Sequence, residues 1–188
     1  MVTLLAHEPT DSPSVCPVDP VPLDPPSPLE AALGYAALGW YVVSLCYPLL
    51  GGGCSHPANF VRRKPHKPGK APLTKHGVND SSIDPDQIRD WWRKWPNANI
   101  GIDLAKSGLL AIAPDSAAWL EEFQRRGLGK PLAAAMSGGG EGHMHFYYTR
   151  PKDCPIRRIN RSGEYDIQTG GYLVARLHCT SPANAMSG

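Results

Sequence analysis

The stretch "NIGIDLAKSGLLAIAPDS", residues 99–116, places two short apolar runs on either side of a turn. The runs cover residues 99–104 and 108–114. Short apolar runs bounded by glycine and polar residues are typical of β-strands, so the stretch predicts two strands paired as a hairpin. The second run leads directly into a single carboxylate, Asp115.

Strand periodicity gives Asp115 a small neighbour. Residues two apart in a strand point to the same face, so Asp115 shares its face with Ala113 rather than with a second acid. The same rule predicts two further pairs on single faces, His143 with His145 and Glu164 with Asp166.

Each of these residues also has a purely structural interpretation. An acid between a strand and a helix is commonly a turn or capping residue. A histidine in a half-buried strand is commonly hydrogen-bonded in place, and "SGGGEG" (137–142) is typical of a flexible hairpin tip. Their combination beside glycine-rich turns favours a ligand site, because glycines let phosphates approach the backbone and backbone amides bind anions.

Capping signals predict the helices. Ser27, Pro28 and Glu30 form a capping box that opens one helix, and Asp84 with Pro85 opens a second over residues 84–95. Few helices among several strands predict an α+β domain. A third helix is expected over residues 117–126 between Ser116 and Gly127, further strands over 40–47, 132–137, 143–149, 164–168 and 170–175, and a proline-bounded loop over 150–163.

Length and composition bound the organisation of the chain. The 188 residues fit one domain, over residues 27–188, and eight prolines among the first 28 residues predict a disordered leader over residues 1–26. Residues 47–83 are expected to form a basic, irregular insert. The net charge of +2 does not by itself indicate a nucleic-acid binder. The odd number of cysteines, five, favours a reducing cytoplasm, and the absence of a long apolar run predicts no membrane segment.

Seven short motifs occur in an order that resembles a known family. A helix and strand "LGYAALGWYVVSL" is followed by "PGKAPL", "HGVNDSSIDPDQIRDWW", "NANIGI", "SGLLAIAPD", "SGGGEGHMHF" and "GEYDIQTGGYLVA". This order resembles the bifunctional DNA primase/polymerase N-terminal family of the archaeo-eukaryotic primase superfamily over residues 28 to 175. The resemblance implies a small αβ unit beside an RNA-recognition-like mixed or antiparallel sheet flanked by helices. It also implies nucleoside triphosphates, a DNA template and Mg²⁺ or Mn²⁺.

The resemblance also assigns roles to single residues. It places metal-binding acids at Asp115 and Asp166, and the first acid of the usual pair falls on Ala113. Glu164 is two residues from Asp166 and shares its strand face, which makes Glu164 the candidate substitute for the missing acid. The resemblance implies His143 as a catalytic residue that meets the phosphates, with Ser137, Gly138 and Gly139 closing on the nucleotide. His145 is a further candidate for nucleotide binding. So is Arg161, within a basic group with Arg157 and Arg158 just before Asp166, for which surface solvation is the alternative.

The departures from the family leave two functions open. The first is metal-dependent nucleotide addition on a DNA template, because Mg²⁺ is often held by only one or two carboxylates. The alternative is a catalytically lapsed domain that binds nucleotide or nucleic acid, which Ala113 and the unusual ending "ARLHCTSPANAMSG" (175–188) favour. Relatives often continue into a helicase-like region, so a separate helicase is an expected partner.

The basic insert raises a third possibility, a structural zinc site. Zinc takes four nitrogen or sulfur ligands, and the candidates are Cys46, Cys54, His56 and His66. The alternative is an irregular segment with a solvated basic face. Six Lys and Arg residues between positions 62 and 75 would also attract phosphates.

The tandem tryptophans Trp91 and Trp92 cannot share a face of a helix. Trp92 and Ile88 are expected to pack inward and Trp91 to be partly exposed. A core role is favoured over base stacking.

Overall fold

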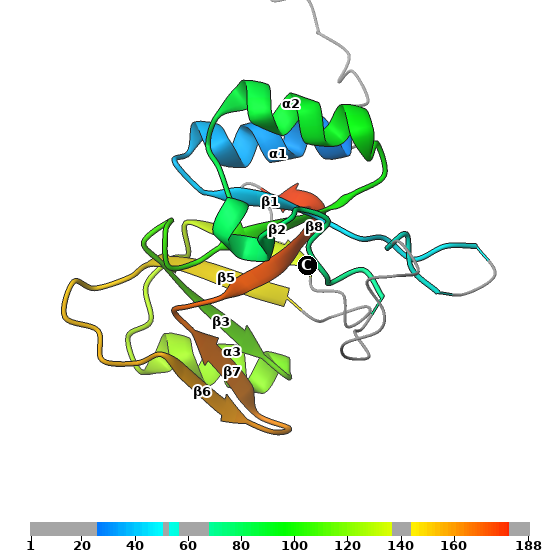
Figure 1. The fold of residues 1–188 in the computed structure, drawn as a ribbon. Coiled ribbons are helices and arrows are strands. Elements are labelled where there is room, and N and C mark those ends of the chain that lie inside the picture. Colours follow the sequence, from blue (N-terminus) through cyan, green and yellow to red (C-terminus); the bar gives the residue numbers. More distant parts are fainter. Residues whose placement is uncertain (1–25, 51–52, 57–67, 137–143, 181–188) are drawn as a thin grey trace, which may run out of the picture.

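The computed structural model describes residues 26–50, 53–56, 68–136 and 144–180, which form an α+β fold (Figure 1). The helices are α1 (Pro28–Ala37), η1, a short 3-10 helix (Gly77–Asp80), α2 (Pro85–Lys94) and α3 (Ala117–Arg125). The strands are β1 (Val42–Leu45), β2 (Asn99–Asp103), β3 (Leu109–Pro114), β4 (Ala133–Met136), β5 (Met144–Thr149), β6 (Arg158–Arg161), β7 (Tyr165–Gln168) and β8 (Tyr172–Thr180).

The described strands form one antiparallel sheet in the order β1-β2-β8-β4-β5-β3-β7-β6. Strand β8 joins two halves, because its residues 172–175 pair with β2 and its later residues pair with β4. The β4–β8 ladder contains a register shift between Ala134 and Met136. We call α1, α2, β1 and β2 the framework half. We call β3 to β7 and α3 the site half.

The predicted hairpin between residues 99–104 and 108–114 is wrong. Strand β2 pairs with β1 and β8, whereas β3 pairs with β5 and β7, so the two strands belong to different halves. The turn between them is closed by backbone hydrogen bonds from Ser107 to Asp103 (3.1 Å) and from Leu109 to Leu104 (2.9 Å). Leu104 and Leu109 are both buried in the core. The turn between them therefore leads the chain from the framework half to the site half.

The predicted helix caps are confirmed. In α1 the Glu30 amide donates to Ser27 Oγ (3.3 Å) and the Ser27 amide donates to Glu30 Oε2 (2.8 Å), which completes the capping box. Asp84 accepts from the Asp86 amide (2.9 Å) at the start of α2. Helix α3 begins after Ser116, and Gly127 beyond its end has φ +91°, a conformation that glycine adopts without strain.

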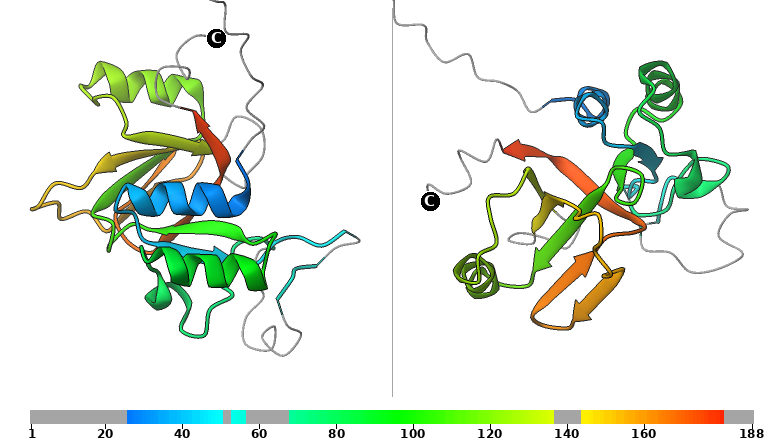
Figure 2. Two further views of the ribbon diagram at one scale, coloured as in Figure 1. Left: turned by 90° about the horizontal axis from the view of Figure 1, so that it is seen from above. Right: turned by 90° about the vertical axis from the view of Figure 1, so that its left-hand side faces the viewer.

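Helices α1 and α2 lie side by side on one face of the framework strands (Figure 2). Ile88 and Trp92 of α2 are buried there, and Trp91 is only partly buried, as the helical spacing predicts. Trp40 connects this core to the site half, because its ring lies 5.7 Å from that of Tyr35 and 5.3 Å from that of Tyr147. No helix in the described part of the chain is long and apolar enough to cross a membrane.

Strand β6 was not expected, because its residues fall in the predicted loop over 150–163. It pairs along its length with β7, and Gly163 at φ +80° forms part of the turn between them. The described part of the insert is held by short bridges, such as the one between Leu45 and Pro72. The leader lies outside the described residues apart from residue 26.

Candidate functional site

One row of paired residues crosses the site half and carries the candidate chemistry. Asp166 on β7 pairs with Ala113 on β3 and with Asn160 on β6. Ile112 pairs with Phe146, and because the strands are antiparallel, the preceding residue of β5, His145, lies beside Ala113. Residues directly opposite in an antiparallel pair point to the same face. His145, Ala113 and Asp166 therefore lie next to one another on one face of the sheet.

Asp115 lies one step further along the same face. Its backbone amide donates to the Glu164 carbonyl (2.8 Å), so Asp115 is opposite Glu164 just beyond the paired ends of β3 and β7. Asp115 is exposed and Glu164 is half-buried. Alternation along the two strands puts these acids on the face that also carries Asp166. The β3–β7 pair thus places three of the predicted acids on one face, although among the described residues no three such side chains form a group that could hold a metal ion.

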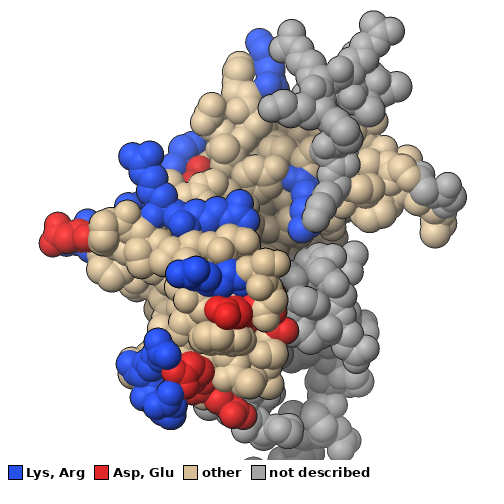
Figure 3. Space-filling view, turned by 90° about the horizontal axis from the view of Figure 1, so that it is seen from below, with Lys and Arg blue, Asp and Glu red and all other residues tan. Residues whose placement is uncertain are grey.

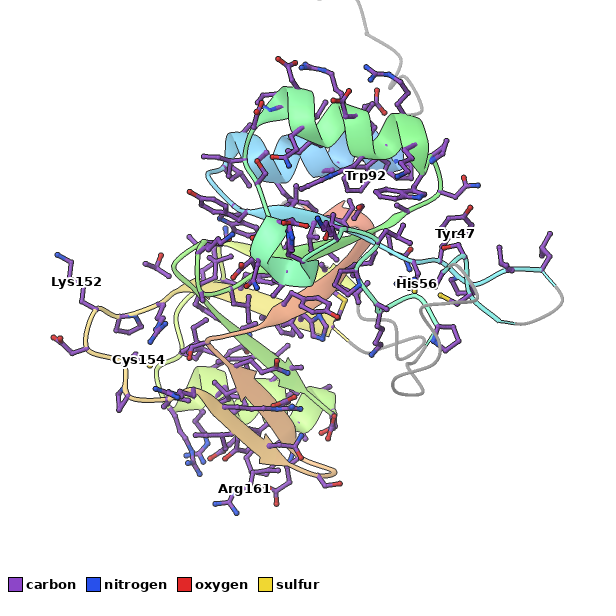
Figure 4. The ribbon with its side chains drawn as sticks, in the orientation of Figure 1. Tyr47, His56, Trp92, Lys152, Cys154 and Arg161 are labelled. Carbon is purple, nitrogen blue, oxygen red and sulfur yellow. The ribbon has the colours of Figure 1, made fainter. Side chains whose placement is uncertain are left out.

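The opposite face is closed by α3. The ring of Tyr165 lies 5.0 Å from the rings of Trp119 and Phe123 on that helix. Arg161 pairs with Tyr165, so alternation places Arg161 on this face and not beside Asp166. Figure 4 shows Arg161 at the far end of the β6–β7 hairpin, pointing away from the sheet. The structure therefore does not bring the predicted nucleotide ligand Arg161 to the row of Asp166.

Of the predicted basic group of Arg157, Arg158 and Arg161, Arg158 is the member that bonds Asp166. Its Nη2 lies 3.0 Å from Asp166 Oδ2, and its Nε lies 3.4 Å from Oδ1. Gln168 Nε2 donates to the same Oδ2 (2.6 Å). Asp166 is thus hydrogen-bonded to Arg158 and Gln168, and its neighbour on β3 is Ala113.

His145 is held neutral by its surroundings. Burial lowers its pKa to about 4, and the Lys70 ammonium acts in the same direction, whereas a hydrogen bond with the Val174 backbone and the charge of Asp166 oppose the shift. Its buried Nδ1 has no hydrogen-bond partner within the described ranges. The bond with Val174 uses the one N–H of the neutral ring, so Nδ1 is left as a hydrogen-bond acceptor.

Several predicted residues cannot be placed. Ser137, Gly138, Gly139 and His143 lie outside the described residues, as does His66. Of the two histidines predicted for this strand, His145 is the one that the pairing of β5 sets beside Ala113 and Asp166.

The cysteines of the insert come together in part. The Cys46 and Cys54 thiols are in hydrogen-bonding contact. Burial is the main cause that raises the pKa of the Cys46 thiol to about 11, and the contact with Cys54 acts in the same direction. His56 Nε2 lies 2.8 Å from the Pro72 carbonyl oxygen. Among the residues that the structure describes, no three metal-ligating side chains form a group. A zinc site in the insert stays a prediction.

Basic side chains accompany the site half. Figure 3 shows Lys and Arg side chains gathered over the side of β6 and β7, with acidic side chains set among them. Some of these charges are paired within α3, where Arg125 and Arg126 bond Glu122. A separate groove of about 450 Å³ on the framework half is lined in part by Trp91, Trp95 and Lys75.

Comparison with known proteins identifies the family of the chain. The family described as "Bifunctional DNA primase/polymerase, N-terminal" matches residues 32–185. The chain belongs to this family. The predicted resemblance is therefore confirmed over most of the sequence, and with it a primase/polymerase-type function in general. The family is generally metal-dependent, with nucleotide and DNA substrates. No curated protein matches the chain.

This face offers carboxylate ligands on separate strands, and no group of three metal-ligating side chains forms in the described part of the chain. Carboxylate oxygens are the ligands that Mg²⁺ and Mn²⁺ prefer, and Asp115 and Asp166 offer them on the same face. Mg²⁺ is commonly held by one or two carboxylates together with substrate phosphates and water. Ala113, however, contributes no ligand between Asp166 and His145, at the position where the resemblance implies an acid.

Proposed function

We propose that this domain adds nucleotides to a primed DNA strand, with a divalent ion held by Asp115 and Asp166 and with Glu164 as the nearest further acid. The observation that supports the proposal is the shared face of Asp166, Ala113 and His145, with Asp115 at the open end of the same strand pair. Three separate strands contribute to this face, as a site for a metal-bound triphosphate requires.

The side chains of this face have distinct tasks in that proposal. A bound divalent ion would neutralise charge on the transferring phosphoryl group. His145 is neutral and its one N–H is on the Val174 backbone, so its Nδ1 can accept a hydrogen bond from the bound nucleotide. Asp115 is exposed, so it can turn toward an ion without loss of packing. The aromatic cluster of α3 closes the opposite face and keeps the strands that carry Asp115 and Asp166 fixed.

The experiment is nucleotide incorporation on a primed DNA template with Mn²⁺ or Mg²⁺. Wild-type protein should extend the primer, and Asp166→Ala should reduce the rate about a thousandfold, since a catalytic metal supplies several kcal/mol of transition-state stabilisation. Arg161→Ala is the matched control, because it removes a charge from the adjacent strand on the opposite face. Extension that persists in Asp166→Ala would refute the assignment.

A second candidate function is favoured by one observation, Ala113. A domain that has lost an acid from its metal site can retain binding of nucleotide or DNA without chemistry. Ala113→Asp separates the two functions, because it restores a carboxylate between Asp166 and His145. An inactive wild type that binds DNA and gains activity with Ala113→Asp would identify a lapsed domain. An active wild type supports nucleotide addition.

A further inference from the structure

Arg158 forms the contact that most clearly distinguishes this site from an ordinary acidic metal site. Two of its nitrogens face the two oxygens of Asp166, at 3.0 and 3.4 Å. This fork geometry suits carboxylates and phosphates equally well. Arg158 is directly opposite Gln168 on β7, so its position in the sheet is fixed by the β6–β7 ladder.

The two partners differ in their freedom to move. The side chain of Arg158 is 61% exposed, whereas that of Asp166 is 19% exposed. Arg158 can therefore leave the pair for solvent or for another anion, while Asp166 stays in place. Ion pairs with so exposed a partner contribute little to stability, so a divalent ion can displace the guanidinium at small cost.

The phosphates of a bound triphosphate are the second partner for a guanidinium that has left Asp166. With Ala113 in place of an acid, the site offers fewer ligands for metal ions and so less positive charge to a triphosphate. Lys70, close enough to lower the pKa of His145, supplies one fixed positive charge nearby. Arg158, which bonds Asp166, supplies a second positive charge.

We propose that Arg158 is a phosphate-binding residue that occupies Asp166 while the site is empty and transfers to the triphosphate when a divalent ion takes the carboxylate. This proposal rests on the proposed function, since it uses the same nucleotide and the same ion. The proposal predicts that removal of Arg158 strengthens the binding of the ion and weakens the binding of the triphosphate. Asp166 is then free for the ion, and the phosphates lose a ligand.

The test uses the full chain with Arg158→Gln, and Arg161→Gln as the matched control from the same strand and the opposite face. Mn²⁺ binding without nucleotide is measured by electron paramagnetic resonance. Binding of an α,β-imido deoxynucleoside triphosphate in the presence of Mg²⁺ is measured by calorimetry. We expect Arg158→Gln to bind Mn²⁺ about two- to fivefold more tightly, and the triphosphate at least about tenfold more weakly. Arg158→Lys keeps the charge without the fork geometry, so its affinities for both ligands should lie between those of the wild type and Arg158→Gln. Arg161→Gln should match the wild type.

Other outcomes overturn the proposal in distinguishable ways. Equal losses of both ligands in Arg158→Gln, together with a lower melting temperature, would make Arg158 a structural residue. Weaker binding of a primed duplex with unchanged triphosphate binding would assign it to DNA instead. Triphosphate binding that depends on Arg158 in a wild type that never extends a primer would uphold this proposal and reject nucleotide addition. A wild type that binds neither Mn²⁺ nor triphosphate would overturn both.

Discussion

Asp103 in the framework half and Asp115 in the site half each stand at the end of a strand, yet their surroundings differ. Asp103 is 5% exposed, and its oxygens accept from the Ser81 hydroxyl (2.8 Å) and the Lys106 amide (3.1 Å). Asp115 is exposed and only its backbone is fixed. A buried acid with two donors supports the fold, because its charge is already satisfied. An exposed acid beside a second carboxylate is available to a cation.

The same contrast holds for the two halves as a whole. The framework half buries large side chains of α1 and α2, whereas the site half leaves Asp115 and Arg158 exposed and Asp166 partly exposed. Variants in the framework half should therefore change stability more than ligand binding. Variants of the exposed acids in the site half should do the reverse.

The largest effect on stability is expected from Trp92→Ala. Trp92 is 2% exposed in the core between α2 and the sheet, so its loss should lower the free energy of unfolding by about 3–5 kcal/mol. Trp91→Ala, on the adjacent and partly buried position, should cost about 1–2 kcal/mol. Urea denaturation of both variants measures the difference. Equal losses would show that α2 does not pack as described.

His145 should make stability depend on pH in the site half. Its pKa in the folded protein, about 4, lies below the ordinary value of 6.5, so the unfolded chain binds this proton first as the pH falls. The free energy of unfolding should then drop between about pH 6.5 and pH 4, by about 3 kcal/mol in all. His145→Gln should remove this part of the slope and leave any dependence below about pH 4.5 that comes from carboxylates. A slope identical in both proteins would contradict a buried neutral His145.

Asp103→Ala and Asp115→Ala test the comparison directly. Loss of Asp103 should lower the free energy of unfolding by about 2 kcal/mol, because hydrogen bonds to a buried charged group are removed. Loss of Asp115 should change it by no more than about 0.5 kcal/mol, as for other exposed positions. Mn²⁺ binding should show the reverse order, with the larger loss for Asp115→Ala. Denaturation and titration of the same two preparations provide both readouts.

The smallest effect is expected at the helix caps. Ser27→Ala removes half of a capping box and should cost about 1 kcal/mol. Ser116→Ala removes a longer single contact (3.4 Å to the Trp119 amide) and should cost less. Thermal unfolding resolves the two. A larger loss for Ser116→Ala would mean that the start of α3 is more important to the site half than its contacts indicate.

Much of the fold could be predicted because the signals are local. Ser27, Asp84 and Ser116 fix the helix starts through contacts within three residues, and alternation along single strands correctly gave the faces of Asp115 and Asp166. The pairing of strands could not be predicted in this way. The turn before Leu109 looks like a hairpin, but the burial of Leu104 and Leu109 and the long-range partners of β2 and β3 decide otherwise.

The acids of the candidate site were predictable from the sequence, as was a basic group of Arg157, Arg158 and Arg161 near Asp166. The family motifs single out Asp115 and Asp166, and the shared strand face adds Glu164. Which arginine faces Asp166 depends on strand β6, whose local signal was the Ser162-Gly163 turn before the segment 164–168. Once β6 is recognised, its register with β7 puts Arg158 on the Asp166 face and Arg161 on the other.

The most direct test is a crystal soaked with Mn²⁺ and an α,β-imido deoxynucleoside triphosphate, with the ion located by its anomalous scattering. We predict one ion bound to carboxylate oxygens of both Asp115 and Asp166 at about 2.0–2.3 Å, with Glu164 within about 6 Å of it and the triphosphate on the same face. An ion bound elsewhere, or Asp115 and Asp166 on opposite faces of the sheet, would contradict this account of the site.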